Sequence, residues 1–335
     1  MTLGLDSDSY GSQSRKLVSC LEAAGMAPSI HNSQPWRFRV VGDRIDVMLD
    51  RDRLLAAIDP TGREAWMSVG AAVLNLRVAI LAGGRVPLTI PLPDPSRPDL
   101  AASVRLGGRH RPDATIRALF GAIPFRRTNR RPFRDIEVRA EVLNQLAAAA
   151  RVEGATLVTM DALGRRSVVA IAETANSWQR ESAEYIEELR IWTAVPLDAR
   201  AGIPAHSFGP LDQFGTLPLR DFGAAHPDLP RHQRPFEHTP TLAILYTTGD
   251  QPRDWLRAGQ AMERVLLTAT VRGVATTPIS APTEEPELRA LLGDEFADHV
   301  AQVILRLGYG DPVPSTPRRP VTDFVELIEP ANASR

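Results

Sequence analysis

The sequence contains very little cysteine and very little lysine. Cys20 is the only cysteine among 335 residues, so the chain cannot form an internal disulfide or a metal site that needs several thiolates. Lys16 is the only lysine, and it stands in no glycine-rich context, which excludes a Walker-type phosphate loop. The low cysteine content agrees with a reducing compartment, and we expect a cytoplasmic protein.

Long apolar runs and a net charge are also missing. No stretch approaches 18 consecutive apolar residues, so we expect no membrane span. The opening MTLGLDSDSYGSQSRK has no basic start followed by an apolar run, which argues against a secretory signal. The net charge is −1, whereas a nucleic-acid partner usually requires a clear basic excess. We therefore expect neither a membrane nor a nucleic acid among the partners.

The expected helices and strands fall into two groups along the chain. Because single hydrophobic cores stop growing at roughly 250–300 residues, a chain of 335 residues suits two lobes. In the first group, periodicity predicts helices over 14–25 and 64–82 and strands over 37–41, 45–49, 86–90 and 102–106. In the second group it predicts helices over 141–150, 163–192 and 255–272 and strands over 155–160, 241–246 and 302–308.

Two stretches show no sustained periodicity. Residues 107–124 are polar and flanked by proline, which is typical of a linker, although 116–120 has the composition of a helical turn. Residues 196–240 are rich in glycine, proline and histidine. A stretch of this length without regular structure inside a compact domain usually forms a lid or a binding loop, or is disordered.

A tryptophan-glycine-glycine pattern occurs twice with the same intervals. Each copy lies in an apolar helix, with spacings of four and fourteen residues; the copies are Trp66, Gly70, Gly84 and Trp255, Gly259, Gly273. An internal repeat explains the match, and two unrelated core helices remain the alternative.

The segment 125–133, FRRTNRRPF, is the strongest candidate for an anion site. It gathers four arginines around Thr128 and Asn129. Arginine forms bidentate, charge-assisted hydrogen bonds with phosphate oxygens, so the segment suits a phosphate monoester. The alternative is a solvated basic turn that pairs with Asp135 and Glu137.

The segment 27–36, APSIHNSQPW, is a second candidate. It packs neutral hydrogen-bonding side chains beside a tryptophan in a short loop between two prolines. A flat heteroaromatic ring with a polar edge, such as nicotinamide or flavin, requires groups of this kind. The alternative is a loop whose amides only cap the neighbouring elements.

The histidines and serines indicate no further chemistry. His206, His226, His232 and His238 all fall in 196–240, but their spacings match no helical pair of metal ligands, so we expect no metal. No serine lies in a GxSxG motif, which leaves acyl hydrolysis unsupported.

Several of these motifs together resemble the FMN-dependent nitroreductases. The loop PSIHNSQPW is similar to their proline-serine-asparagine loop, and RRTNR is similar to their opening arginine motif. PIS at 278–280 and RLGYG followed by PRRP at 317–320 agree with the same family. In ordinary members the arginine motif precedes the loop, whereas here the loop comes first. This order resembles the Acg-like branch, which carries a long lid.

The resemblance implies an α+β, nitroreductase-like fold with two related halves in one chain that mimic the family homodimer. The halves would be residues 1–110, with the loop, and 125–330, with the arginines. Residues 111–124 would link them, and a lid would be inserted at about 196–240. FMN would lie between the halves, and a monomer is expected, with a dimer as the alternative.

The resemblance also assigns the cofactor contacts. The FMN phosphate would be held by Arg126, Thr128, Arg130 and Arg318, with Arg127 and Arg319 as alternates. The isoalloxazine ring would be contacted by Pro28, Ser29 and Asn32 on one side and by Pro278, Ile279 and Ser280 on the other. Many family members have an acidic residue where Ser280 stands.

The function implied is NAD(P)H-dependent reduction of nitroaromatic or quinone-type acceptors through flavin N5. No catalytic side chain is expected, because the cofactor carries the chemistry. The alternative is a protein that binds and sequesters flavin under a closed lid, with little or no turnover.

Overall fold

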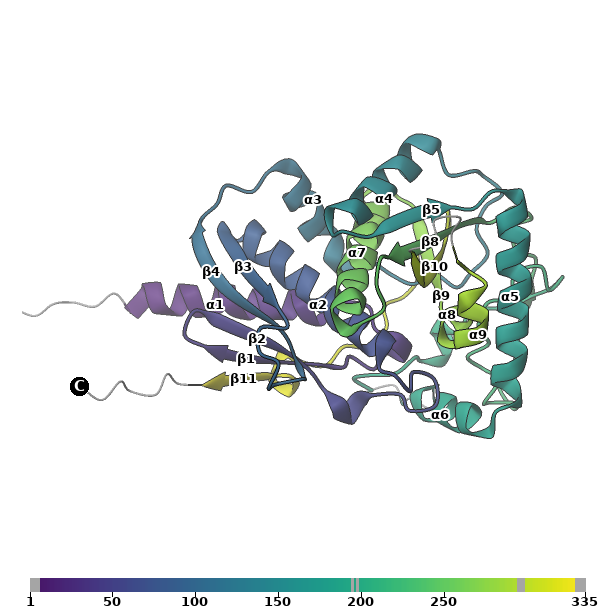
Figure 1. The fold of residues 1–335 in the computed structure, drawn as a ribbon, viewed down its shortest axis with the longest axis horizontal. Helices are drawn as coiled ribbons and strands as arrows, with labels where there is room; N and C mark the ends of the chain where they lie inside the picture. Colours follow the sequence, from purple (N-terminus) through teal and green to yellow (C-terminus); the bar gives the residue numbers. More distant parts are fainter. Residues whose placement is uncertain (1–6, 194–195, 197–198, 294–298, 329–335) are drawn as a thin grey trace, which may run out of the picture.

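The described residues form two main β-sheets and one small two-stranded sheet, with helices packed between and around the main sheets (Figure 1). This fold is seen in a computed structural model that describes residues 7–193, 196, 199–293 and 299–328. The α+β class expected from the sequence is confirmed.

The first sheet is built mainly from the N-terminal part of the chain. The strand order is β11-β1-β2-β4-β3, and the first hairpin turns at Gly42, whose φ of 60° suits glycine. Its strands are β1 (Trp36–Val41), β2 (Arg44–Leu49), β3 (Arg85–Pro91), β4 (Leu100–Arg109) and β11 (Val325–Ile328). Helices α1 (Ser7–Gly25) and α2 (Arg63–Ala82) accompany this sheet.

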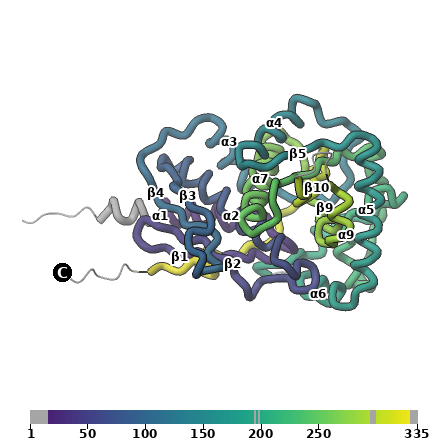
Figure 2. The backbone as a smooth tube through the Cα atoms, viewed as in Figure 1, coloured from purple at the N-terminus to yellow at the C-terminus, as the bar shows by residue number. Residues whose placement is uncertain are grey.

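Strand β11 brings the end of the chain back to its beginning. It runs parallel to β1, with Phe38 opposite Val325. Figure 2 shows this C-terminal segment beside the N-terminal strands. Strand β11 therefore belongs to the first sheet, although the expected second half extended to residue 330.

The expected linker contains regular structure. Helix α3 (Ala114–Ala122) occupies most of 111–124, and the Asp113 side chain accepts a hydrogen bond from the Ile116 N–H at 2.8 Å, which caps the helix. The division of the chain at residues 110 and 124 stays a prediction.

The second sheet is antiparallel, with the order β5-β8-β10-β9. Its strands are β5 (Thr156–Thr159), β8 (Thr241–Thr247), β9 (Ala275–Ile279) and β10 (Val300–Gly308). The helices around it are α4 (Ala140–Val152), α5 (Ala162–Glu181), α6 (Ala183–Thr193), α7 (Pro252–Val271), α8 (Ala281–Glu284) and α9 (Pro286–Ala290).

The prediction of a single helix over 163–192 is wrong in one respect, because the segment is divided into α5 and α6 at Ser182. The backbone of Ser182 is extended, with φ −83° and ψ 120°. Its side-chain oxygen accepts a hydrogen bond from the Tyr185 N–H at 3.2 Å, so Ser182 ends one helix and caps the next.

The two helices of the tryptophan-glycine-glycine pattern, α2 and α7, pack directly against each other. A Cβ atom on Gly259 would lie 1.9 Å from the Met67 carbonyl oxygen, and one on Gly70 would lie 2.3 Å from the Leu256 oxygen. Gly84 and Gly273, which follow the two helices, both have positive φ. The matched glycines thus have matched structural roles at the crossing and at the helix ends.

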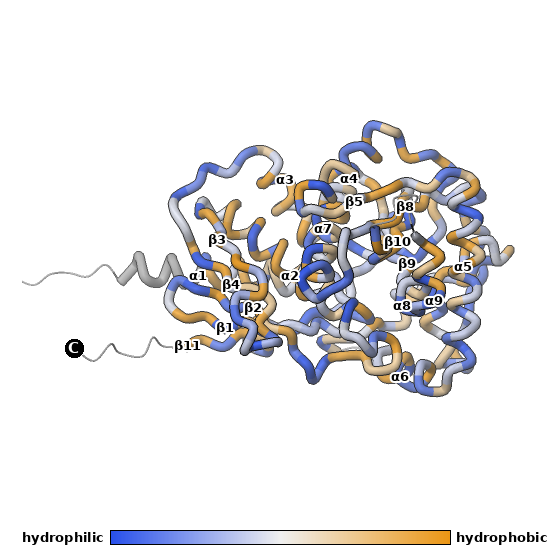
Figure 3. The backbone as a smooth tube through the Cα atoms, viewed as in Figure 1, coloured by the Kyte–Doolittle hydropathy of each residue, from blue (hydrophilic) through white to orange (hydrophobic). Residues whose placement is uncertain are grey.

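Helix α2 is long and apolar enough to cross a membrane by length and composition. Most of it is buried inside the fold, as expected for a core helix. Figure 3 shows hydrophobic residues along α2 and along β8.

The described residues of 196–240 form an ordered cover with little regular structure. They contain the short strands β6 (Leu211–Asp212) and β7 (Gln233–Arg234), which pair with each other. Ile203, Phe208 and Phe222 from this cover pack against Ile30 and Tyr185 in one apolar cluster. The cover therefore lies against the loop that contains Ser29 and Asn32.

Candidate functional site

The loop 28–36 has an unusual and well-supported backbone. His31, Asn32 and Gln34 all adopt left-handed φ values, of 44°, 54° and 54°. The Ser29 side-chain oxygen accepts the Gln34 N–H at 3.0 Å, and the Ser68 oxygen on α2 accepts the Ile30 N–H at 3.1 Å. The first bond stabilises the loop internally, and the second fixes it against the core helix α2.

Asn32 joins three segments that are far apart in the sequence. Its side-chain nitrogen donates to the Gly202 oxygen at 2.9 Å and to the Pro317 oxygen at 3.0 Å. Its side-chain oxygen accepts a hydrogen bond from Arg318 at 2.9 Å. The amide predicted to contact a ring is thus committed to holding the cover and the C-terminal segment in place.

The arginine segment is attached to the edge of the second sheet. The Asn129 N–H donates to the Thr276 oxygen at 2.9 Å, and the Thr277 hydroxyl donates to the Asn129 oxygen at 2.6 Å. Arg130 donates to the Ser207 oxygen at 3.0 Å, and its guanidinium lies 4.4 Å from the centre of the Phe222 ring. Both contacts of Arg130 are with the cover.

A cavity of about 390 Å³ lies between the loop and the arginine segment. Among the described residues that line it, none is acidic. The basic lining residues are Arg126, Arg127, Arg130, Arg131, Arg318 and His206. We refer to this space as the basic cavity.

The basic cavity has the electrostatics of an anion site. Burial, together with the positive charges of Arg126 and Arg127, lowers the pKa of Arg318 to about 9. Burial and the charge of Arg220 lower the pKa of Arg130 to about 10. The Nε atoms of Arg126 and Arg318 are buried without a hydrogen-bond partner. A phosphate group fits these residues because it would supply the missing negative charge and acceptors.

A second cavity of about 110 Å³ adjoins the first, and we call it the inner cavity. Both cavities are lined by Pro28, Ser29, Thr128 and Arg130. The inner cavity is also lined by Pro278, Ile279 and Ser280 and by the side chains of Met67 and Met262. Its mixture of apolar walls and a few polar groups suits a flat ring, and the shared lining allows one ligand to span both cavities.

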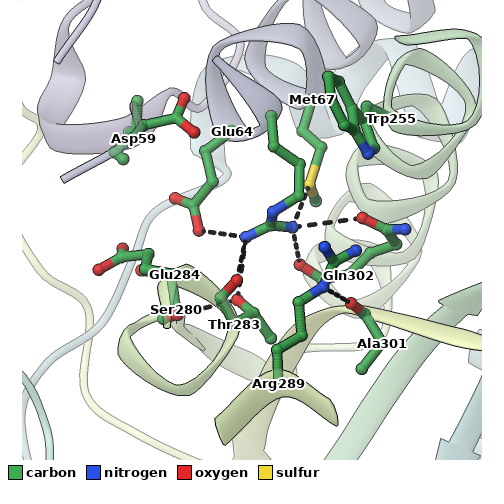
Figure 4. Close-up of polar contacts among 12 residues, drawn as sticks. Asp59, Glu64, Met67, Trp255, Ser280, Thr283, Glu284, Arg289, Ala301 and Gln302 are labelled. Atoms are coloured by element: carbon green, nitrogen blue, oxygen red, sulfur yellow. Dashed lines mark hydrogen bonds and ion pairs between the residues drawn. The ribbon is translucent and has the colours of Figure 1, made fainter. Parts of the chain in front are cut away.

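One wall of the inner cavity is formed by a buried charged network that Figure 4 shows in close-up. Glu64 lines the cavity and binds Arg63 at 2.9 Å. Arg63 also donates to the Gln302 oxygen at 2.6 Å, which links α2 to the second sheet. Burial and the nearby charge of Glu284 raise the pKa of Glu64 above its ordinary value.

The cover supplies another part of the lining of the inner cavity. Leu219, Arg220 and Phe222 line it, and Arg220 forms a buried ion pair with Glu284. Arg220 also donates to Nε2 of His31 at 2.6 Å. Burial and the charges of Arg220 and Arg130 hold the pKa of His31 well below its ordinary value, so the imidazole is neutral near pH 7.

The structure places all but one of the residues predicted to contact the cofactor on one of the two cavities. Arg126, Arg127, Thr128, Arg130, Arg318, Pro28, Ser29 and Asn32 line the basic cavity, and Pro278, Ile279 and Ser280 line the inner one. Arg319 differs, because it binds the Gln34 and Asp323 carbonyl oxygens and is absent from both linings.

The sequence analysis missed two groups of residues that line the inner cavity: the cover residues and the buried charged residues. Arg220 and Phe222 lie in a stretch without periodicity and gave no local signal. Glu64 was detectable in principle, because an acidic residue in an otherwise apolar helix is unusual.

Of the cover histidines, His206 lines the basic cavity, His226 contacts Thr193 and His238 contacts Asp135. The described residues contain no group of three or more side chains placed to hold a metal ion.

Comparisons with a family model and with known proteins both match this chain to nitroreductases. Residues 123–309 match a family model described as the Nitroreductase family. Two proteins of Mycobacterium tuberculosis, both provisionally named NAD(P)H nitroreductases, are similar over nearly their whole lengths. One is 34% identical, over 92% of this chain and 90% of its own. The other, named acg, is 31% identical, over 93% of this chain and 95% of its own.

Solved structures give a partial match. A nitroreductase with bound FMN from Bacteroides fragilis has a TM-score of 0.36 and 17% identity, and the match covers 60% of this chain and 94% of that one. An iodotyrosine deiodinase bound to FMN and 3-iodo-L-tyrosine has a TM-score of 0.39 and 16% identity, covering 64% of this chain and all of that one.

Proposed function

This chain belongs to the nitroreductase family, and on that premise we propose that it binds FMN across its two joined cavities and reduces small acceptors with electrons from NAD(P)H. The acceptors would be nitroaromatic or quinone-type compounds. FMN supplies the redox chemistry when bound, and the protein provides binding, orientation and electrostatics.

One observation carries the proposal. Arginines that follow α3 and a loop that precedes β1 line the same basic cavity, which continues into the inner cavity through Thr128 and Arg130. The arrangement suits a ligand with a phosphate at one end and a flat ring at the other. The buried Nε atom of Arg318, which has no hydrogen-bond partner, supports a phosphate at the basic end.

The residues of the chain have separate tasks in this proposal. The arginines bind the phosphate, while Pro278, Ile279 and Met67 provide an apolar surface for the ring. The Arg130 guanidinium lines both cavities and can stabilise negative charge that develops on a bound ring. The cover contributes Leu219 and Phe222 to the lining of the inner cavity, where their apolar side chains would limit the access of water to a bound ring.

Anaerobic titration of the FMN-loaded protein with NADH and with NADPH tests the reductase function. We expect the absorbance of the oxidised flavin near 450 nm to fall with at least one of the two. Unchanged absorbance with both would reject the reductase function while leaving FMN binding intact.

A second candidate function is flavin sequestration, and the position of the cover favours it. Arg220 and Phe222 occupy the wall of the inner cavity, where a nicotinamide or an acceptor must approach a bound ring. The buried ion pair between Arg220 and Glu284 stabilises this closed arrangement. In this state the protein would bind flavin and exclude both reaction partners.

Replacing Phe222 with alanine distinguishes the two functions. The change removes the ring that lies over Arg130 and opens the inner cavity without altering charge. Under sequestration we expect the variant to oxidise NAD(P)H at least tenfold faster than the wild type. Phe214→Ala, at an exposed position of the same cover, is the matched control. Equal rates in all three proteins would count against a blocking cover.

Location and assembly remain part of the proposal. The lone cysteine supports a cytoplasmic location. A monomer is supported because distant segments of one chain line the same cavity.

A further inference from the structure

A buried carboxylate lies directly behind the basic cavity. Glu263 on α7 is 0% exposed, and its Oε1 atom is 3.6 Å from Nε of Arg126, which is 4% exposed. Arg126 lines the cavity, whereas Glu263 does not. The pair therefore connects the anion site to the core helix through one arginine.

The pair has few hydrogen-bond partners. The Glu263 carboxylate is hydrogen-bonded by Asn75 of α2, Nε of Arg126 faces the carboxylate at 3.6 Å, and Nε of Arg318 is buried without a hydrogen-bond partner. Buried polar groups in native proteins usually have partners, and those without one deserve a functional explanation. The charged groups that act on Glu263 are Arg126 and Arg318, while the facing residue from α2 is the neutral Asn75.

Glu263 is poised to change its protonation state. Burial raises the pKa of Glu263 to about 7, against the opposing effect of the Arg126 charge. A phosphate dianion in the basic cavity would add negative charge on the far side of the same arginine. Like charges disfavour the ionised carboxylate, so the arrival of phosphate must push Glu263 towards its neutral form.

We propose that Glu263 is a positioning residue for the phosphate site, which holds Arg126 in place and takes up a proton when the phosphate group of FMN binds. This inference rests on the proposed binding of FMN. It assigns a role to a residue that touches neither the phosphate nor the ring and acts through Arg126.

Calorimetry measures the number of protons that the protein takes up when FMN binds. FMN is titrated into the apoprotein at pH 7.5 in several phosphate-free buffers of different ionisation enthalpy, and the slope of the observed enthalpy gives the protons taken up. A rise of about one unit in the pKa of Glu263 corresponds to uptake of about half a proton at this pH. The FMN phosphate is itself mostly dianionic at pH 7.5, because its second pKa is about 6, and contributes little.

Two comparisons test whether Glu263 is the group that takes up the proton. We expect the Glu263→Gln protein to show no such uptake, and the exposed control Glu173→Gln to behave as the wild type. Riboflavin, which lacks the phosphate, should bind to the wild type without proton uptake. The riboflavin comparison needs only the wild type, so equal proton uptake with both ligands would reject phosphate-linked uptake even if Glu263→Gln does not fold.

The affinity gives a second readout. Proton uptake makes binding weaker as pH rises, so the Kd of the wild type for FMN should increase by about threefold between pH 7 and pH 8, where Arg318 stays largely charged. The Kd of Glu263→Gln should stay nearly constant over this range. A merely structural role of Glu263 would change affinity without changing its pH dependence.

The outcomes separate this inference from the proposed function. Equal proton uptake in the wild type and Glu263→Gln, or equal uptake with FMN and riboflavin, would overturn the role of Glu263 while FMN binding stands. If neither FMN nor inorganic phosphate binds, the inference and the proposed function both fail.

Discussion

Arg130 links the two cavities in a single side chain. It lines both, donates to the Ser207 oxygen and packs on Phe222. The resemblance of the sequence motif predicts Arg130 as a phosphate contact, which stays a prediction, but nothing local revealed that the cover packs on it. Long-range contacts of this kind depend on how the whole chain folds.

Replacing Arg130 with glutamine should weaken FMN binding much more than riboflavin binding. A hydrogen bond to a charged group contributes about 1.5–3 kcal/mol, so the Kd for FMN should rise by about 10- to 100-fold. Fluorescence titration of both ligands measures this, with the exposed Arg134→Gln as control. An equal loss for the two ligands would show that Arg130 does not recognise the phosphate.

His31 should make the protein less stable in acid. Its folded pKa lies well below the unfolded value of about 6.5, so the unfolded chain binds the proton more readily. The contribution is present above pH 6.5 and is lost as the pH falls towards the folded pKa. Between pH 7 and 5.5 we expect a loss of about 1 kcal/mol from this residue.

Urea denaturation at the two pH values measures this loss. His31→Asn is the suitable comparison because asparagine tolerates the left-handed backbone at this position. Its stability should change less between pH 7 and 5.5 than that of the wild type. An identical pH dependence in both proteins would contradict the assignment.

Among the elements, those with a strong internal pattern were predictable. Helices α2 and α7 and strands β8 and β10 follow from hydrophobic periodicity alone. The division at Ser182 was missed because the pattern of apolar residues continues across it. Strand β11 was missed because the strand with which it pairs, β1, lies almost 300 residues earlier in the chain.

The crossing of α2 and α7 should not tolerate a side chain at Gly259. An added Cβ would lie 1.9 Å from the Met67 oxygen and 2.6 Å from its carbonyl carbon, and backbone atoms have little freedom to move. Overpacking of this kind costs about 1–3 kcal/mol, and we expect Gly259→Ala to reach the upper end.

Gly121→Ala provides the matched control in a helix. A Cβ there meets nothing within 4 Å, so alanine should stabilise α3 by about 0.5–1 kcal/mol. Thermal or urea denaturation of both variants checks the pair. A Gly259→Ala protein as stable as the wild type would show that the helices are farther apart than described.

At the scale of the whole molecule, the site depends on segments from both ends of the chain. The loop 28–36, the arginine segment, the cover and residues 313–318 meet at the basic cavity. Composition, motif order and resemblance predicted that the loop and the arginines would converge. The return of the C-terminal strand to the first sheet could not be predicted, because no local pattern encodes a pairing over that distance.

A site completed within one chain predicts a monomer. Light scattering coupled to size exclusion should give a mass close to 36.6 kDa for the FMN-loaded protein. A mass of about twice this value at micromolar concentration would contradict the prediction.

The FMN content of the purified and reconstituted protein is the most direct test of the central claim. After excess FMN is removed by gel filtration, the absorbance near 450 nm and the protein concentration give the number of flavins per chain. The composite site predicts one FMN per chain. Failure to retain FMN, or one FMN for every two chains, would contradict it.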